Sequence, residues 1–248
     1  MRASGVAVTG LDREGDAVVR CDLFVEPEAL QRAVAEHDML LLCVAEPVAL
    51  RALEVLDDHV RSEQVVVDIC SVKSNICAAA QRLCRGAQYL SIHPMFGPDR
   101  GFDGHNMVGM TLRDGPAVAS AAELFRSWGA AWLDTDSETH DQVTSVVQVM
   151  THATLALFAH AREDLTQRVN APPALVQAMA TPIFAELSRV AEGMLRENPS
   201  LYHNIQTANP NGELARASLA QAAGEVLQTM GADDVAEVVD LFERLRVD

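Results

Sequence analysis

The sequence is poor in basic residues. Lysine and arginine together number 19 against 35 aspartates and glutamates, so the formal net charge of the 248 residues is −16. No basic stripe of the kind that follows a phosphate backbone is present, and nucleic acid is therefore not an expected partner. We expect the acidic surface mainly to keep the protein soluble.

Two other absences bear on location and on metals. The chain shows no signal peptide and no apolar run that approaches the length of a membrane span, so we expect a cytoplasmic protein without membrane contact. The cysteines are odd in number and lack the paired spacing of metal ligands, which indicates reduced thiols in the core and no metal site. They are Cys21, Cys43, Cys70, Cys77 and Cys84.

Short apolar runs alternate with amphipathic stretches in the first half of the chain, which is the rhythm of a parallel sheet covered by helices. Strands are predicted over 5–11, 39–44, 64–69, 88–92, 107–112 and 131–134, with helices from Pro47, from Ser74 and over 116–128. From Ser137 only helices are predicted, over 138–168, 173–197, 212–229 and 232–245. The fold class is therefore α/β followed by all-α, with a Rossmann-like sheet domain over 1–136 and a helical domain over 137–248.

The predicted sheet domain has no glycine-rich turn at its start. A dinucleotide-binding domain ordinarily begins with a strand, such a turn, and a helix whose first amides hold the pyrophosphate. Residues 1–12 are instead typical of the end of that helix followed by the second strand, so a βα segment of roughly two dozen residues is absent and the doubly wound sheet is incomplete. Either an upstream segment supplies the turn, which we favour, or the chain has lost ordinary cofactor binding.

Three residues are candidates for contact with a dinucleotide. Asp12 ends a predicted strand where such folds place an acid on the adenine ribose, and a carboxylate there favours NAD over NADP because it repels the extra phosphate. A simple turn cap is an equally weighted alternative for Asp12. Val44 ends another predicted strand and Ser71 follows a third, and ligands bind in the crevice outside the carboxyl ends of such strands.

The stretch Ser-Ile-His-Pro-Met-Phe-Gly-Pro-Asp-Arg-Gly at 91–101 is the most informative in the chain. His93 ends a predicted strand, and the two prolines and two glycines after it stiffen the loop. A histidine titrates near neutral pH and acts as a base when its ring is held against a substrate. His93 is therefore the first catalytic candidate, and a loop histidine bonded to nearby backbone is the alternative.

A second motif, Asp-Ile-Cys-Ser-Val-Lys-Ser at 68–74, closes the apolar run of a buried strand. Ser71 and Lys73 would lie at the carboxyl end of that strand. Carboxyl ends of neighbouring parallel strands meet at one edge of a sheet. A hydroxyl, an ammonium group and the His93 imidazole are therefore expected to come together there.

These motifs resemble the prephenate and arogenate dehydrogenase family. The resemblance continues through Thr-His-Asp-Gln at 139–142, Thr-Pro-Ile-Phe at 181–184 and Glu-Asn-Pro-Ser-Leu-Tyr-His-Asn-Ile at 197–205, so it covers most of the chain. It implies NAD as cofactor and a helical domain that interlocks into a homodimer. It also implies oxidative decarboxylation of a cyclohexadienyl substrate in tyrosine or related aromatic biosynthesis.

The resemblance also implies roles for single residues. His93 would accept the proton of the ring hydroxyl while hydride passes to the nicotinamide, and Ser71 would bond the same hydroxyl or orient His93. Lys73 would support the loop or a carboxylate, with plain solvation as the alternative. Asp99 would hold its loop or gate the substrate through a partner such as Arg100, with a turn role equally plausible.

A polar stripe marks the long helix that follows Ser137. Thr144, Gln148 and His152 are spaced by four and share a face in a segment rich in Val, Met, Leu and Ala. An interhelical hydrogen-bond network is one interpretation. The resemblance favours substrate binding by His152 and Gln148, because the family's substrate-side histidine falls twelve residues after the His-Asp pair that begins here at His140.

One position departs from the family. The resemblance places a carboxylate-binding arginine at Gly193, and a glycine makes no charge-assisted fork to a carboxylate. Arg189 and Arg196 lie on the same predicted helix and are candidates to replace it, with solvent exposure as the alternative. The substrate is accordingly prephenate or a close relative, such as arogenate or an amino-substituted prephenate of a specialised pathway.

Two further functions stay open at this stage. A non-catalytic dimeric binding protein is consistent with the missing glycine turn and with Gly193, although His93, Ser71 and His152 argue against it. A different NAD-dependent reductase with the same two-domain plan would not need the histidine loop.

Overall fold

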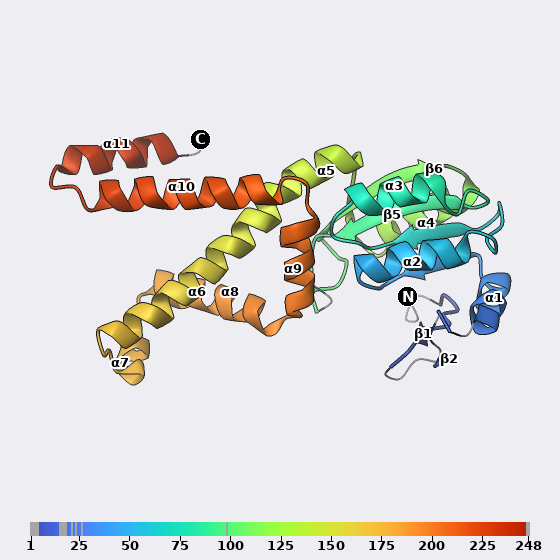
Figure 1. The fold of residues 1–248 in the computed structure, drawn as a ribbon, viewed down its shortest axis with the longest axis horizontal. Helices are drawn as coiled ribbons and strands as arrows, with labels where there is room; N and C mark the ends of the chain where they lie inside the picture. The colour runs from blue at the N-terminus through green and yellow to red at the C-terminus, as the bar shows by residue number, and fades with distance from the viewer. Residues whose placement is uncertain are drawn as a thin grey trace. The chain divides into compact units, whose positions relative to one another are not determined.

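The chain forms two compact units, residues 1–140 and residues 141–248. The structure is a computed structural model, and it describes residues 5–14, 19, 20, 22, 24, 25, 27–97 and 99–246. Pro98 of the histidine loop and the first four residues of the opening segment lie outside the described residues. Figure 1 labels the elements in chain order.

A five-stranded sheet is the centre of the first unit. Its strands lie in the order β3 (Met39–Leu42), β4 (Val65–Asp68), β5 (Gln88–Pro94), β6 (Asn106–Arg113) and β7 (Ala131–Asp134). The pairs β3–β4, β4–β5 and β6–β7 are parallel, as the strand–helix alternation predicts.

The parallel pairing that the alternation predicts does not extend to β5 and β6, which pair antiparallel. No helix is present in the described part of the connection over 95–105. Parallel neighbours need a long crossover, usually a helix, whereas a chain that returns directly pairs antiparallel. The sheet is therefore mixed.

Helices cover both faces of this sheet (Figure 1). Side chains alternate along each strand, so Val66 and Tyr89 pack with α1 (Pro27–Glu36), α2 (Glu46–Leu56) and α3 (Ser74–Arg82). Their strand neighbours Val65, Val67, Leu90 and Ile92 face the other side and pack against α4 (Pro116–Ser127). This two-sided burial explains why the β4 strand Val65–Asp68 is buried along its whole length.

The predicted first strand over 5–11 does not form as such. Only Leu11–Asp12 is extended (β1), and it pairs in parallel with β2 (Val19–Arg20) as a separate two-stranded sheet. Among the described residues, the edges of the larger sheet are therefore β3 and β7.

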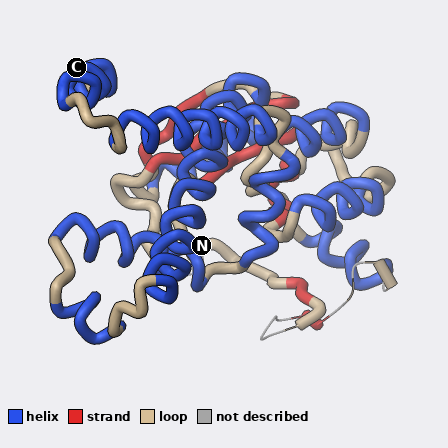
Figure 2. The backbone as a smooth tube through the Cα atoms, turned by 60° about the vertical axis from the view of Figure 1, so that its left-hand side comes forward, coloured by secondary structure: helices blue, strands red, loops and turns tan. Residues whose placement is uncertain are grey.

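The second unit is helical, as predicted (Figure 2). One helical run covers 137–168 and consists of α5 (Ser137–Thr144), the π-helical η2 (Ser145–Met150) and α6 (Thr151–Arg168). The π segment was not anticipated. The run is followed by α7 (Pro173–Ala178), α8 (Pro182–Arg196), α9 (Pro199–Ala208), α10 (Gly212–Met230) and α11 (Val235–Leu245).

Two helix boundaries differ from the prediction for local reasons. The single helix expected over 173–197 is two helices, because the Thr181 side chain caps α8 by accepting a hydrogen bond from the amide of Phe184. Helix α9 was not predicted, although Asn198 caps it in the same way and Pro199 occupies its first turn.

The expectation that no segment is long and apolar enough to span a membrane is wrong for the helical run Ser137–Arg168. By length and composition it is apolar enough to cross a bilayer, and 28% of its most apolar window is buried. The core helix of a soluble protein passes the same test, so this finding alone is weak evidence for a membrane.

Gly193 offers a test of the helix packing. It lies inside α8, and an added Cβ would meet no atom within 4 Å. Alanine reduces the freedom of the unfolded chain and favours the helix, so Gly193→Ala should raise the free energy of unfolding by about 0.5–1 kcal/mol in urea denaturation. Gly109→Ala is the control, because its Cβ would lie 2.1 Å from the Trp132 ring and should destabilise the protein. A loss of stability in Gly193→Ala would contradict the open space that the structure shows beside Gly193.

Candidate active site

A buried ion pair lies at the carboxyl end of β4. Lys73 Nζ is 2.9 Å from Asp68 Oδ1, and both side chains are fully buried. The same ammonium group donates to the backbone oxygen of Ile92 on β5, at 2.7 Å. Asp68 also accepts from the amide of Cys70 and, through Oδ2, from the hydroxyl of Tyr89 at 3.1 Å. These bonds tie the loop after β4 to the end of β5.

The position of Lys73 rules out the solvated alternative and agrees with a role in supporting the loop. Its side chain lies in the interior, so it is not solvated and does not reach out to a ligand from the surface. The ammonium group instead fixes the loop that carries Ser71, which is partly buried. Burial, followed by the Asp68 charge and its hydrogen bond, raises the pKa of Tyr89, so its hydroxyl stays a hydrogen-bond donor. Sequence reasoning missed Asp68, although it stands five residues before Lys73 in the same motif.

His93 lies near the end of β5 with only 3% of its surface exposed. Its Nδ1 is 2.9 Å from Nε2 of His140 in α5, and the two ring planes are tilted by 55°. Burial holds the pKa of His93 well below its ordinary value, and the charges of Lys73 and His140 act in the same direction. The imidazole is therefore neutral at neutral pH and able to accept a proton.

The loop after His93 is anchored by aromatic side chains. Phe96 packs edge-on against Phe102, with ring centroids 5.5 Å apart, and Phe102 packs in turn against Trp128 at 4.9 Å. Gly101 and Gly104 have φ of 74° and 70°, the left-handed region that favours glycine. The loop is thus held on the α4 side of the sheet.

Asp99 lies at the exposed tip of this loop. Its carboxylate is 4.0 Å from the guanidinium of Arg100, and the two side chains are 77% and 65% exposed. This pair matches the partner expected for a gate, and an exposed pair of this kind adds little stability. The role of Asp99 toward a substrate stays a prediction.

The exposed ends of β3 and β4 form the candidate binding site for the nicotinamide ring of a dinucleotide. Cys43, Val44 and Ala45 are exposed directly after β3, and Ser71 lies at the end of the neighbouring strand. Their small side chains permit the close approach of a flat ring. The residues present fit the nicotinamide end of a dinucleotide, whereas the sequence contains no G-x-G-x-x-G turn to hold a pyrophosphate.

Asp12 takes part in a local turn. Its Oδ1 accepts a hydrogen bond from the amide of Glu14 at 3.0 Å, and the residue is exposed. This bond is the turn-cap role that was one of its two expected roles. Contact with a ribose stays a prediction.

The polar stripe of the long helix divides into two environments within the second unit. Thr144 belongs to an interhelical network, because the Asn209 side-chain amide donates to its Oγ1 at 3.2 Å and to the Asp141 backbone oxygen at 2.9 Å. Gln206 reaches the π segment and donates to the backbone oxygen of Val149 at 2.8 Å. These amide side chains satisfy carbonyl groups around the π turn.

His152 lies beyond the π segment and packs edge-on against Tyr202, with ring centroids 4.8 Å apart. Burial lowers the pKa of His152. Its Nδ1 is buried and has no hydrogen-bond partner among the described residues. Gln148 is partly buried one turn before it. A neutral imidazole with an unsatisfied buried nitrogen is suited to a polar ligand.

Neither arginine candidate in α8 is buried. The guanidinium of Arg189 pairs with Glu186 on the same helix, and Arg196 pairs with Glu192 at 3.7 Å. Their side chains are 65% and 80% exposed. The solvent-exposed alternative therefore describes both residues in this structure, and an added Cβ at Gly193 meets only open space.

An α/β unit with a neutral histidine at the carboxyl edge of its sheet, followed by a helical unit, has the architecture of the nicotinamide-dependent dehydrogenases. Residues 1–155 match the nucleotide-binding domain of prephenate dehydrogenase, and residues 136–244 match its dimerization domain. The chain belongs to the prephenate dehydrogenase family. The resemblance seen in the motifs is thereby confirmed, as is the order of sheet domain and helical domain.

Individual relatives cover nearly the whole chain. The 4-amino-4-deoxyprephenate dehydrogenase of Streptomyces pristinaespiralis is 34% identical over 98% of this chain and 83% of its own length. A crystal structure of a Corynebacterium glutamicum protein described as a prephenate dehydrogenase has a TM-score of 0.73 at 20% identity, covering 98% of this chain and 80% of that one.

A third similar fold carries ligands. Aquifex aeolicus prephenate dehydrogenase in complex with hydroxyphenyl propionate and NAD+ has a TM-score of 0.67 at 14% identity. The match covers 98% of this chain and 89% of that one. At this identity the likeness concerns the fold.

The buried pair of Lys73 and Asp68 generates a stability prediction. Lys73→Met leaves the Asp68 carboxylate uncompensated in the interior, so it should lower the free energy of unfolding by about 3–5 kcal/mol in urea denaturation. The double variant with Asp68→Asn removes the orphaned charge and should recover part of that loss. Arg168→Met, which removes a side chain 75% exposed in its pair with Asp164, is the control and should change stability little. Equal losses in Lys73→Met and Arg168→Met would contradict the assignment.

Proposed function

We propose that the protein catalyses the NAD-dependent oxidative decarboxylation of prephenate or a close cyclohexadienyl relative, in tyrosine or related aromatic biosynthesis. The observation that carries the proposal is the buried His93 at the carboxyl edge of the sheet, with its ring held against His140. Family membership and the 34% identical relative that acts on an amino-substituted prephenate support it.

His93 is proposed as the general base. It takes the proton of the ring hydroxyl, or of the ring amino group in an amino-substituted substrate, as the ring carbon is oxidised. Ser71 bonds the same substituent or orients His93. The bond to the ring carboxylate breaks with loss of carbon dioxide, and its electron pair makes the ring aromatic. NAD, when bound, supplies the hydride acceptor.

Other residues are proposed to hold the reactants. His152 and Gln148 bind the substrate from the helical unit, supported by the buried Nδ1 of His152. Asp12, Val44 and Ser71 contact NAD. Lys73 acts on the site indirectly, because its ammonium group is engaged with Asp68 and with the backbone of β5. Membership of a dehydrogenase family favours an enzyme over the non-catalytic binding protein.

The amino-substituted substrate is a second candidate. It is favoured by the 34% identical relative, and Gly193 stands where the resemblance expects a carboxylate-binding arginine. Arg189 and Arg196 form exposed ion pairs with glutamates of their own helix. This agrees with a site in which neither arginine binds a substrate carboxylate. Comparing turnover on prephenate, arogenate and 4-amino-4-deoxyprephenate separates these substrates.

His93→Asn tests the base directly. General base catalysis contributes about two to four orders of magnitude, so turnover followed by NADH absorbance should fall by that factor on the preferred substrate. Calorimetric titration of NAD should give nearly the same affinity for wild type and variant. His160→Asn, at an exposed position of α6, is the matched control and should keep full turnover. Unchanged turnover in His93→Asn would remove His93 from the mechanism.

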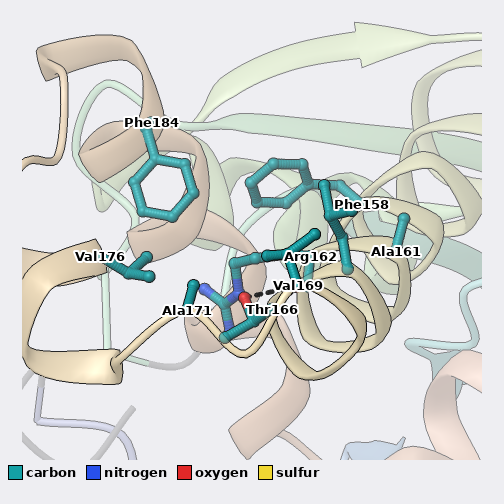
Figure 3. A pocket seen from close by; sticks show the side chains of 9 residues that line it. Phe158, Ala161, Arg162, Thr166, Val169, Ala171, Val176 and Phe184 are labelled. Atoms are coloured by element: carbon teal, nitrogen blue, oxygen red, sulfur yellow. Dashed lines mark hydrogen bonds between the residues drawn. The ribbon is translucent and has the colours of Figure 1, made fainter.

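We also propose a cytoplasmic homodimer that forms through the helical unit. Large apolar side chains of this unit are exposed in the single chain, among them Val146, Val147, Leu157, Leu227, Val235 and Phe242. An apolar pocket of about 440 Å³ opens between α6, α7 and α8, lined by Phe158, Leu165, Val176 and Phe184 (Figure 3). The match to a dimerization domain supports burial of this apolar surface against a second copy.

Sedimentation measures the dimer. A Val146→Glu/Leu227→Glu double variant places two carboxylates on side chains that are 54% and 72% exposed in the single chain, and it should sediment as a monomer. Leu133→Glu makes the same chemical change at an exposed residue of β7 in the first unit and should leave the dimer intact. A monomeric wild type would contradict the proposal.

A further inference from the structure

His140 lies against the proposed base and was not expected to have a role. It is 3% exposed, and its backbone amide donates to the oxygen of Asp136 at 3.0 Å in the first turn of α5. The Asp136 side chain caps this turn by accepting from the amide and hydroxyl of Thr139, each at 2.8 Å. The His140 backbone is therefore held in place independently of its ring.

Only one hydrogen can lie between the two facing ring nitrogens. His93 Nδ1 and His140 Nε2 are 2.9 Å apart, a distance at which one nitrogen donates and the other accepts. When His93 donates from Nδ1, its Nε2 carries the lone pair and is the proton acceptor. When His140 donates instead, His93 carries its hydrogen on Nε2 and cannot act as a base.

The neighbouring charge disfavours a second hydrogen on the His93 ring, so His93 is in one neutral tautomer or the other. Lys73 Nζ donates to the backbone oxygen of Ile92, the residue before His93, so an ammonium charge is fixed beside the imidazole. The charge of Lys73 acts on His93, and Asp68 partly neutralises that charge. Lys73 is also the only lysine among the 19 lysine and arginine residues of the chain, and its compact ammonium group makes both of these buried contacts.

We propose that His140 is a positioning residue that holds His93 in the tautomer with its hydrogen on Nδ1, and so makes Nε2 the proton acceptor. The reaction that uses this acceptor rests on the proposed function above, whereas the tautomer does not. His140 would act on turnover through the ring of His93 and would touch neither substrate nor cofactor.

The tautomer is measured by NMR of the ring nitrogens in the full chain labelled with ¹⁵N-histidine. His37 is an internal standard, because its Nδ1 lies 2.7 Å from the Ala33 backbone oxygen, which only accepts, so Nδ1 carries the hydrogen. His93 is assigned from the signals that disappear in His93→Asn. We expect His93 in wild type to show the same pattern as His37, with the hydrogen on Nδ1.

Two variants separate positioning from packing. His140→Leu fills the space but accepts no hydrogen bond, so His93 should lose its single tautomer and kcat should fall about tenfold or more with KM little changed. His140→Gln keeps an amide oxygen near the place of Nε2, and it should restore both the His93 pattern and most of kcat. Rescue by glutamine but not leucine is not expected of a merely structural residue.

Each outcome bears on the proposal. A wild-type spectrum with the hydrogen of His93 on Nε2 would overturn it, whatever the His140 variants show. So would a His140→Leu protein that keeps both the tautomer and kcat. If the tautomer is as expected but His93→Asn retains full turnover, the proposed function fails and the inference about the ring pair stands.

Discussion

The structure depends on the buried contact between Asp68 and Lys73. Taking an ammonium group and a carboxylate out of water is unfavourable unless each is paired and hydrogen-bonded, and here both are. Because the partners of Lys73 lie on two neighbouring strands, the pair sets the end of β4 against the end of β5. The loop that carries Ser71 and the strand that carries His93 are thereby held together at one edge of the sheet.

A charge so close to a histidine also shapes its chemistry. The ammonium group and the surrounding apolar core both disfavour a second positive charge, so the imidazole of His93 stays neutral. A single group thus serves two purposes, since Lys73 holds the loop and disfavours protonation of His93. Such a coupling between stability and reactivity is common where perturbed pKa values gather at functional sites.

The helical unit is held together by other contacts. Its 32-residue helical run is apolar but little buried within one chain, so much of its apolar surface is exposed in the single chain. The π turn at 145–150 is accommodated because Gln206 donates to a carbonyl of the segment and Asn209 braces the preceding turn. Amide side chains on α9 and at its end therefore hold an irregular backbone next to the candidate substrate residues.

The sequence by itself determined the family, the order of the two domains and most of the strands, because apolar periodicity and the His93 and Lys73 motifs are local features. It also singled out His93 as the central residue. The missed elements had local signals too, since Thr181 and Asn198 are followed by prolines and cap the helices that begin there.

Tertiary structure decided the rest, because the deciding contacts join residues far apart in the chain. The antiparallel pairing of β5 with β6, the burial of Lys73 and the approach of His140 to His93 across 47 positions have no local signature. The spacing of four along Thr144, Gln148 and His152 assumed a regular α-helix, whereas a π turn intervenes. Only the folded structure shows which polar groups are hydrogen-bonded to one another and which are exposed to water.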